Sequence, residues 1–161
     1  MSSQPRRRSF VVPALLSLTG AVLGALAAAA GGPYDYHPVT PCRVFDTRVV
    51  GPQTNGQPLA NPGPYLFRIQ GNCGIPNGAA AVTLNATVVG PSTNGDLRLT
   101  PLTPDTVSTL NYPGGISALA NGATEPLAAV TQPTDKDLRV VIGMQTSGTI
   151  HLIIDVTGYF Q

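Results

Sequence analysis

Residues 43–48 read Arg-Val-Phe-Asp-Thr-Arg and place one carboxylate between two guanidinium groups. Only 11% of the chain is charged, so three charges this close together stand out. Two kinds of chemistry fit the arrangement: a catalytic carboxylate in a cationic site, or an ion-paired structural contact. Far along the chain, Asp155 lies among isoleucines and valine, where an unpaired charge would be strongly unfavourable. Asp155 therefore needs a partner.

These residues predict a structural clasp between the two ends of the domain. We expect Asp155 to accept charge-assisted hydrogen bonds from Arg43 or Arg48, with Asp46 capping the turn or completing the network. In a regular strand, Asp46 and Arg48 would share one face and Arg43 would lie on the other. Breaking a buried pair of this kind would cost on the order of 3 to 5 kcal/mol.

The acids of the chain show no spacing that selects a catalytic pair. A glycoside hydrolase needs two carboxylates roughly 5 to 10 Å apart in an open cleft. A serine hydrolase needs a Gly-x-Ser-x-Gly turn, and residues 115–119 lack its second glycine. We therefore predict no catalytic residue and no cofactor. A hydrolase would have to draw on acids that converge only in the fold, namely Asp46, Asp96, Asp105, Glu125, Asp135, Asp137 and Asp155.

No metal site is predicted either. Residues 135–137 read Asp-Lys-Asp but lack the glycine and distal glutamate of an EF-hand loop, so a solvated turn is expected. The two histidines have no ligand spacing. His151 is expected to pack within a strand or to bind a backbone group, and His37 to lie in an unstructured lead.

The first 30 residues have the pattern of a signal peptide. Arg6, Arg7 and Arg8 precede an apolar run that ends in small residues around Ala28 to Ala30. Residues 7–10, Arg-Arg-Ser-Phe, resemble the twin-arginine export signal. A retained membrane anchor is the competing interpretation, because the run approaches the roughly 20 residues that span a bilayer. The sequence predicts a secreted or extracytoplasmic bacterial protein with no permanent membrane anchor after cleavage.

The charge balance of the remaining chain bears on its partners. Without the three arginines of the leader, six of the nine basic residues remain against eight acidic ones, a net charge of −2. Nucleic-acid binding needs a concentrated basic face, so nucleic acid is not expected as a partner. The remaining chain of about 130 residues is the size of one domain.

Two cysteines, Cys42 and Cys73, lie in the exported part. An even count in an oxidising compartment favours a disulfide between them. Closing this loop of about 30 residues would contribute roughly 3 to 4 kcal/mol. A metal site would need further ligands, and a catalytic thiol would need a base that the sequence does not visibly supply.

Period-two hydrophobicity and closely spaced turn residues predict an all-β fold. Asn-Gly pairs and prolines leave no room for crossover helices, which favours a single antiparallel β-sandwich, jelly-roll-like. Residues 79–100 are expected to form a hairpin through Asn94-Gly95. Residues 114–130 are expected to be a loop followed by a strand, because their glycines break any helix. The expected strands span residues 64–71, 79–90, 106–112, 124–130, 137–144 and 148–159.

Several segments carry a resemblance to a known family. The sequences PCRVFDTR, GIPNGAAAVTLNATVVGPSTNGDLRLTP, STLNY followed by ALANG, and the closing HLIIDVTGYF resemble a β-domain of exported bacterial, often actinobacterial, proteins. That family opens with an R-x-x-D-T-R motif and closes with D-V-x-G-Y-F. The resemblance covers nearly all of the exported chain but implies no established activity. The cysteines are not part of the shared pattern, so the disulfide rests on compartment alone.

The expected organisation is a signal peptide over residues 1–30, an extended lead over 31–41 and a β-sandwich domain over 42–161. The favoured function is a non-catalytic exported surface or interaction module. Its candidate partners are a cell-wall polymer, a glycan, another surface protein or further copies of itself. The alternative is a small extracellular hydrolase that uses Asp and Glu residues. The chain has no tryptophan and few exposed tyrosine candidates, which weakens the case for a lectin.

The signal-peptide assignment predicts that the exported protein begins near Gly31, because the small residues before it suit signal peptidase. Intact-mass spectrometry of secreted material checks this, and a mass that retains Met1 or the apolar run would contradict it.

Overall fold

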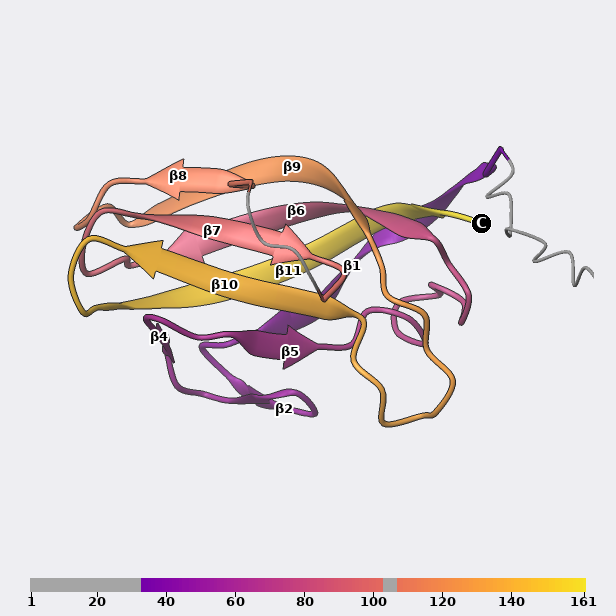
Figure 1. Cartoon of the computed structure of the whole chain (residues 1–161), viewed down its shortest axis with the longest axis horizontal. Coiled ribbons are helices and arrows are strands. Elements are labelled where there is room, and N and C mark those ends of the chain that lie inside the picture. Colours follow the sequence, from indigo (N-terminus) through magenta and orange to yellow (C-terminus); the bar gives the residue numbers. More distant parts are fainter. Residues whose placement is uncertain (1–32, 103–106) are drawn as a thin grey trace, which may run out of the picture. The chain divides into compact units, whose positions relative to one another are not determined.

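The computed structural model describes residues 33–102 and 107–161 (Figure 1). The predicted signal peptide lies outside the described residues. Within them the protein is all-β, with eleven strands and no helix. The strands are β1 Tyr36–Asp46, β2 Val50–Gly51, β3 Thr54–Asn55, β4 Leu59–Ala60, β5 Tyr65–Phe67, β6 Ala81–Val89, β7 Gly95–Thr100, β8 Leu110–Tyr112, β9 Ala118–Pro126, β10 Leu138–Met144 and β11 Thr149–Phe160.

The strands form a sandwich of two antiparallel sheets, which confirms the predicted fold class. One sheet has the order β1-β11-β6-β9, with β4 also paired to β11, and the other has the order β5-β10-β7-β8. Strands β2 and β3 form a separate small hairpin. In Figure 1 the strands β10 and β7 lie in front of β11 and β6, so the two sheets appear as two layers.

The core fills the space between the sheets. Alternate residues of β6 are fully buried, as the period-two pattern predicted, and they face leucines, valines and isoleucines from β7 and β10. Burying each of the valine, leucine and isoleucine side chains contributes about 1.5 to 3 kcal/mol. Phe45 of β1 stacks on Phe67 of β5 with ring centroids 3.9 Å apart, which joins one sheet directly to the other.

The expected extended lead belongs to the sandwich. Strand β1 begins at Tyr36 rather than near Cys42 and pairs with the end of β11. The ring of His37 stacks on Tyr159 at 4.8 Å, so the prediction of an unstructured His37 is wrong. Backbone pairing with β11 and ring contacts near the end of β11 order this segment. The prolines of the segment gave no sign of this pairing in the sequence.

The expected hairpin over residues 79–100 is also wrong. Strands β6 and β7 lie in different sheets, and β6 pairs with β11 and β9. The backbone of the segment that connects them forms hydrogen bonds with other parts of the chain. Ser92 N donates to Thr149 O, and Gly115 N donates to Pro91 O. The two strands instead pack face to face across the core, because each has one apolar face to bury.

Strand β9 was expected to be mostly loop. It spans Ala118–Pro126, starts earlier than the expected strand at 124–130, and pairs with β6 along its whole length. Its alanines, glycine and asparagine have low β-propensity, and most of its side chains are exposed. Pairing with the well-ordered β6 supplies the stability that the side chains do not.

The predicted disulfide between Cys42 and Cys73 is present, with Cα atoms 5.7 Å apart. It joins β1 to the loop that follows β5. A second tie to this loop is polar: the buried carboxylate of Asp137 accepts the backbone N–H groups of Ile69 at 2.7 Å and Gln70 at 2.8 Å. Burial raises the pKa of Asp137, although these two hydrogen bonds oppose the shift. The expected solvated turn at residues 135–137 is therefore wrong at Asp137.

Reducing the disulfide should lower the free energy of unfolding by about 3 to 4 kcal/mol, because the unfolded chain regains loop entropy. For a domain of this size we expect the melting temperature to fall by roughly 10 °C. Thermal melts with and without reductant measure this. The double variant Cys42→Ser/Cys73→Ser serves as the control, since reductant should not change it. An unchanged melting temperature of the wild type on full reduction would contradict the prediction.

Candidate functional site

The structure brings the four residues of the predicted clasp together at the end of β1. Arg43 donates to Asp155 through Nε (2.8 Å to Oδ1) and Nη2 (3.1 Å to Oδ2). Its Nη1 also lies 3.4 Å from Oδ2 of Asp46. Arg48 donates to Asp46 through Nε (2.9 Å to Oδ1) and Nη2 (2.6 Å to Oδ2). Arg43 thus bridges two carboxylates, while Arg48 binds only one of them.

The expectation that Arg43 lies on the opposite face from Asp46 is wrong. The register of β1 against β11 shifts between Arg43 and Phe45, which marks a β-bulge or a similar irregularity. An extra residue in one strand moves the following side chains to the other face. Arg43 is therefore directly opposite Asp155 and still reaches Asp46.

Asp46 is the buried member of the group. Its side chain is 6% exposed, against 50% for Arg43 and 27% for Asp155. Its Oδ1 accepts the backbone N–H of Arg48 at 3.0 Å, and its carbonyl accepts that of Val49 at 3.2 Å, so it also caps the turn. The hydrogen bonds from Arg48 hold the pKa of Asp46 below its usual value despite burial. The Arg43–Asp155 pair is partly solvated rather than buried. We therefore expect Asp46 to contribute most of the clasp's free energy of stabilisation.

Thr47, which the sequence did not single out, ties the same turn to β11. Its side chain is buried, its N–H donates to Leu152 O at 3.0 Å, and its hydroxyl accepts the N–H of Leu152 at 2.9 Å. The hydroxyl also lies 3.1 Å from Nδ1 of His151, a side-chain contact where packing or a backbone hydrogen bond was expected. The only sequence signal for this role was the position of a threonine inside the charged motif.

The turn leads directly into the hairpin formed by β2 and β3. Val50 in this hairpin is 81% exposed. The hairpin is held again at its tip, where Gln53 donates to Arg68 O at 2.8 Å and accepts the N–H of Arg68 at 2.6 Å. The hairpin is therefore fixed at its base by Asp46 and Thr47 and at its tip by Gln53.

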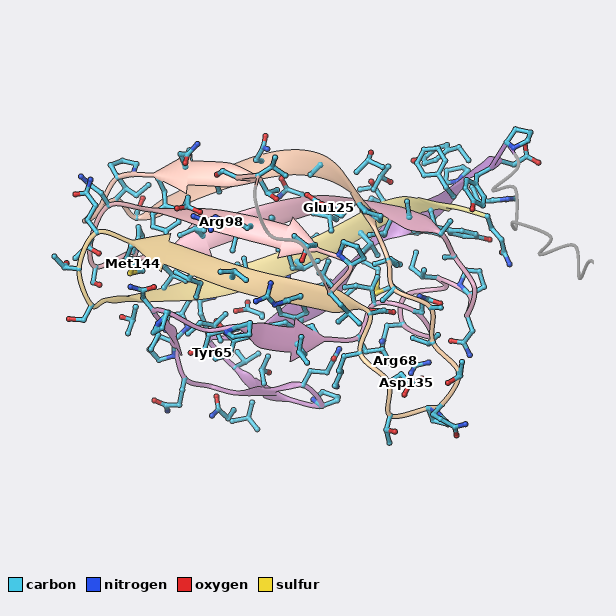
Figure 2. The ribbon with its side chains drawn as sticks, viewed as in Figure 1. Tyr65, Arg68, Arg98, Glu125, Asp135 and Met144 are labelled. Atoms are coloured by element: carbon cyan, nitrogen blue, oxygen red, sulfur yellow. A yellow bond between two sulfur atoms is a disulfide. The ribbon has the colours of Figure 1, made fainter. Side chains whose placement is uncertain are left out.

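A groove with a volume of about 690 Å³ lies between the hairpin and β5. Figure 2 labels Tyr65, which comes from β5 and lines this groove. Lys136 reaches it from the loop before β10, with Nζ 3.4 Å from Oε1 of Gln53. Of the described residues that line it, none is an aspartate or a glutamate. Sequence reasoning missed this groove, because its walls come from short strands and loops that are separate in the sequence.

A smaller hollow of about 210 Å³ lies near the motif and shares part of the hairpin. Arg43, Phe45 and Asp46 line it together with Val49 and Asn72. The charged motif therefore forms the wall of a hollow as well as the base of the hairpin.

Two described acids have a raised pKa, which is a property of general acids, and neither lines the hairpin groove. Burial raises the pKa of Glu125 on β9, but its Oε1 accepts the hydroxyl of Thr109 at 2.9 Å and it does not line the hairpin groove. Asp137, the other acid with a raised pKa, is fully buried. Within residues 33–102 and 107–161, no three metal-binding side chains gather at one point.

Comparisons with protein-family models, with curated proteins and with solved structures each find no match for this chain. In the described part of the chain, no helix is long and apolar enough to cross a membrane.

Replacing Asp46 by asparagine should lower the free energy of unfolding by about 1 to 3 kcal/mol, because a buried acceptor of charged hydrogen bonds is lost. Arg43→Ala and Asp155→Asn should each cost only about 0 to 1 kcal/mol, since their contact is partly solvated. Denaturant unfolding at pH 7 measures these differences. If Asp46→Asn is as stable as the wild type, Asp46 does not support the fold.

The same network predicts a pH dependence. Because the folded-state pKa of Asp46 is lowered, its contribution to stability is complete above its unfolded-state pKa of about 4. The contribution is lost as the pH falls through the lower folded-state pKa. The stability gap between the wild type and Asp46→Asn should therefore shrink below about pH 4. A gap that stays constant down to pH 2 would contradict the lowered pKa.

Proposed function

We propose that this protein is a non-catalytic interaction module, exported by a bacterium, that binds a polysaccharide such as a cell-wall polymer in the groove between the β2–β3 hairpin and β5. The observation that carries the proposal is the composition of the groove: amide and threonine side chains, one tyrosine and one lysine lie beside prolines, leucines and a phenylalanine, with no acid among the described residues that line it. The intact disulfide supports an oxidising compartment.

The side chains of the groove suit a sugar chain. Sugar rings present apolar C–H faces and a rim of hydroxyl groups. Tyr65 and Leu66 offer apolar contact, and the amides of Asn55 and Gln57 each carry both donors and acceptors for hydroxyl groups. Lys136 adds an ammonium group with three donors, which suits an acidic substituent on the polymer.

The groove is also pre-formed. Gln53 and the hydroxyl of Tyr65 already bind backbone groups of the same chain, which fixes the walls in place. A rigid groove loses little conformational entropy when it binds an extended ligand. A hydrolase at this groove would need a general acid that its described lining lacks, so binding without cleavage fits the residues better.

Purified exported protein should co-sediment with insoluble bacterial cell-wall material. Lys136→Ala and Gln57→Ala should each weaken binding by roughly two- to tenfold, the effect of losing one hydrogen-bonding group. Gln132→Ala is the matched control for Gln57→Ala, because Gln132 is also exposed and does not line the groove.

Three results would overturn the proposal. The first is a wild type that stays in the supernatant with every polymer tested. The second is a dimer in solution that Val50→Ser converts to a monomer, since the exposed hairpin would then be an interface between copies. The third is equal sedimentation of the groove variants and the control, which would place the binding elsewhere on the protein.

A further inference from the structure

Strand β9 is the last strand of its sheet and pairs on one side only, with β6. Figure 1 shows it along the top of the drawing, with no strand beyond it. Its residues pair with β6 without a register shift, so its other edge is regular as well. A regular, unpaired edge presents a row of backbone N–H and C=O groups to which another strand can add.

The hydrogen bonds at the two ends of β9 show which of its residues face outward. Leu127 N donates to Ala80 O, and Gly90 N donates to Ser117 O. The backbone groups of residues 117 and 127 therefore point toward β6, and in an antiparallel pair this direction alternates from one residue to the next. The residues whose backbone groups point away from β6 and include an N–H are Ala118, Ala120, Gly122 and Thr124. Among the described residues, none forms a hydrogen bond with these outward groups.

The other outermost strands of the two large sheets carry features that prevent such pairing. Strand β1 contains Pro38 and Pro41, and its register against β11 shifts twice. Strands β5 and β8 are only three residues long, and Pro64 precedes β5. Prolines, bulges, charges and short length are the usual protection of a sheet edge. Residues 118–124 of β9 have none of them.

The side chains of β9 leave room for a neighbouring strand. Both faces are exposed over residues 118–122. These residues read Ala-Leu-Ala-Asn-Gly, so only Leu119 and Asn121 carry a side chain larger than a methyl group. Leu119 is 37% exposed, although leucine gains free energy from burial. A second strand beside β9 would therefore meet little steric hindrance and would cover an exposed leucine.

We propose that β9 pairs antiparallel with β9 of a second copy of this chain, about a twofold axis at Asn121. The four residues with outward N–H groups lie symmetrically about Asn121. Ala118 would then pair with Thr124 of the partner subunit, and Ala120 with Gly122 of the partner subunit. Every outward N–H and C=O group from residue 118 to residue 124 gains a partner in this arrangement.

The charge of β9 favours this partner and this direction. Glu125, which Figure 2 labels, is the only charged residue of β9. In the antiparallel pair it would lie opposite Ser117 of the partner subunit, so the two glutamates are at opposite ends of the contact. A parallel pair in register would place them side by side, where they repel. This surface is separate from the hairpin groove and does not rest on the function proposed for it.

Sedimentation velocity and amide hydrogen exchange of the exported protein test the proposal. The contact is small, so we expect the apparent mass to double as the concentration approaches about 1 mM and to return to that of a monomer on dilution. The amides of Ala120 and Gly122 should become roughly tenfold or more better protected as the dimer forms. Those of Leu119 and Asn121 bind β6 and should be protected at every concentration.

Ala120→Pro should weaken dimerisation by roughly tenfold or more, because it removes an outward N–H at the centre of the contact. Pairing with β6 should survive, since an edge strand tolerates proline where its N–H faces solvent. Ala120→Val is the matched control, because it keeps the N–H and should dimerise like the wild type.

Asn121→Asp gives a second test if Ala120→Pro folds poorly. It would place two carboxylates directly opposite each other and should also weaken the dimer. Asn55→Asp is its control, since it makes the same change at an exposed residue of the β2–β3 hairpin and should leave the dimer intact.

The proposal fails in three cases. The first is a protein that stays monomeric up to about 1 mM, even if an unrelated extended peptide binds to β9. The second is a dimer that neither Ala120→Pro nor Asn121→Asp weakens, including one that only Val50→Ser disrupts. The third is a dimer in which the amides of Ala120 and Gly122 exchange as fast as in the monomer.

Discussion

The hydrogen-bonded carboxylate of Asp46 is the interaction on which the position of the β2–β3 hairpin depends. It is almost completely buried, and it accepts hydrogen bonds from two arginine side chains and from the backbone of the turn that follows. Through Arg43 it is connected to Asp155 of β11, and through the turn it sets where the β2–β3 hairpin begins. A buried carboxylate without these partners would be strongly unfavourable, so the turn and the strand ends have to meet at this point.

This constraint gives the charged motif a role that differs from its appearance. An acid between two arginines resembles a catalytic centre, but a carboxylate with a lowered pKa and all its oxygens hydrogen-bonded is a poor general acid. Its effect is positional. Asp46 fixes the base of the β2–β3 hairpin, which forms one wall of the groove, and Gln53 fixes the tip of the same hairpin. A similar contact occurs on β7, where Arg98 fixes the carboxylate of Asp96. In both places, charged or amide side chains fix the position of surface groups through hydrogen bonds.

Sequence reasoning reached the parts of this structure that depend on local pattern. The alternation in β6 and the apolar runs of β10 and β11 predicted strands close to those observed, since one face of each strand must be buried. Asp155 in an apolar strand correctly implied an arginine partner. Features that depend on pairing between distant segments were missed. Strand β9 is ordered by β6 rather than by its own side chains, and the register irregularity in β1 reverses the expected face of Arg43. The hairpin groove combines residues from segments that are far apart in the sequence, so no single stretch of sequence indicates it.

Amide hydrogen exchange of the Asp46→Asn variant tests the central role of this carboxylate most directly. The N–H groups of Arg48 and Val49 bind Asp46, and that of Thr47 binds β11. If Asp46 positions the hairpin, these amides should exchange roughly tenfold faster or more in the variant, while amides of β6 such as Leu84 change much less. Equal protection of the turn in both proteins would contradict the account. So would a uniform loss of protection through β6 and the turn, because Asp46 would then support the whole fold without any particular effect on the hairpin.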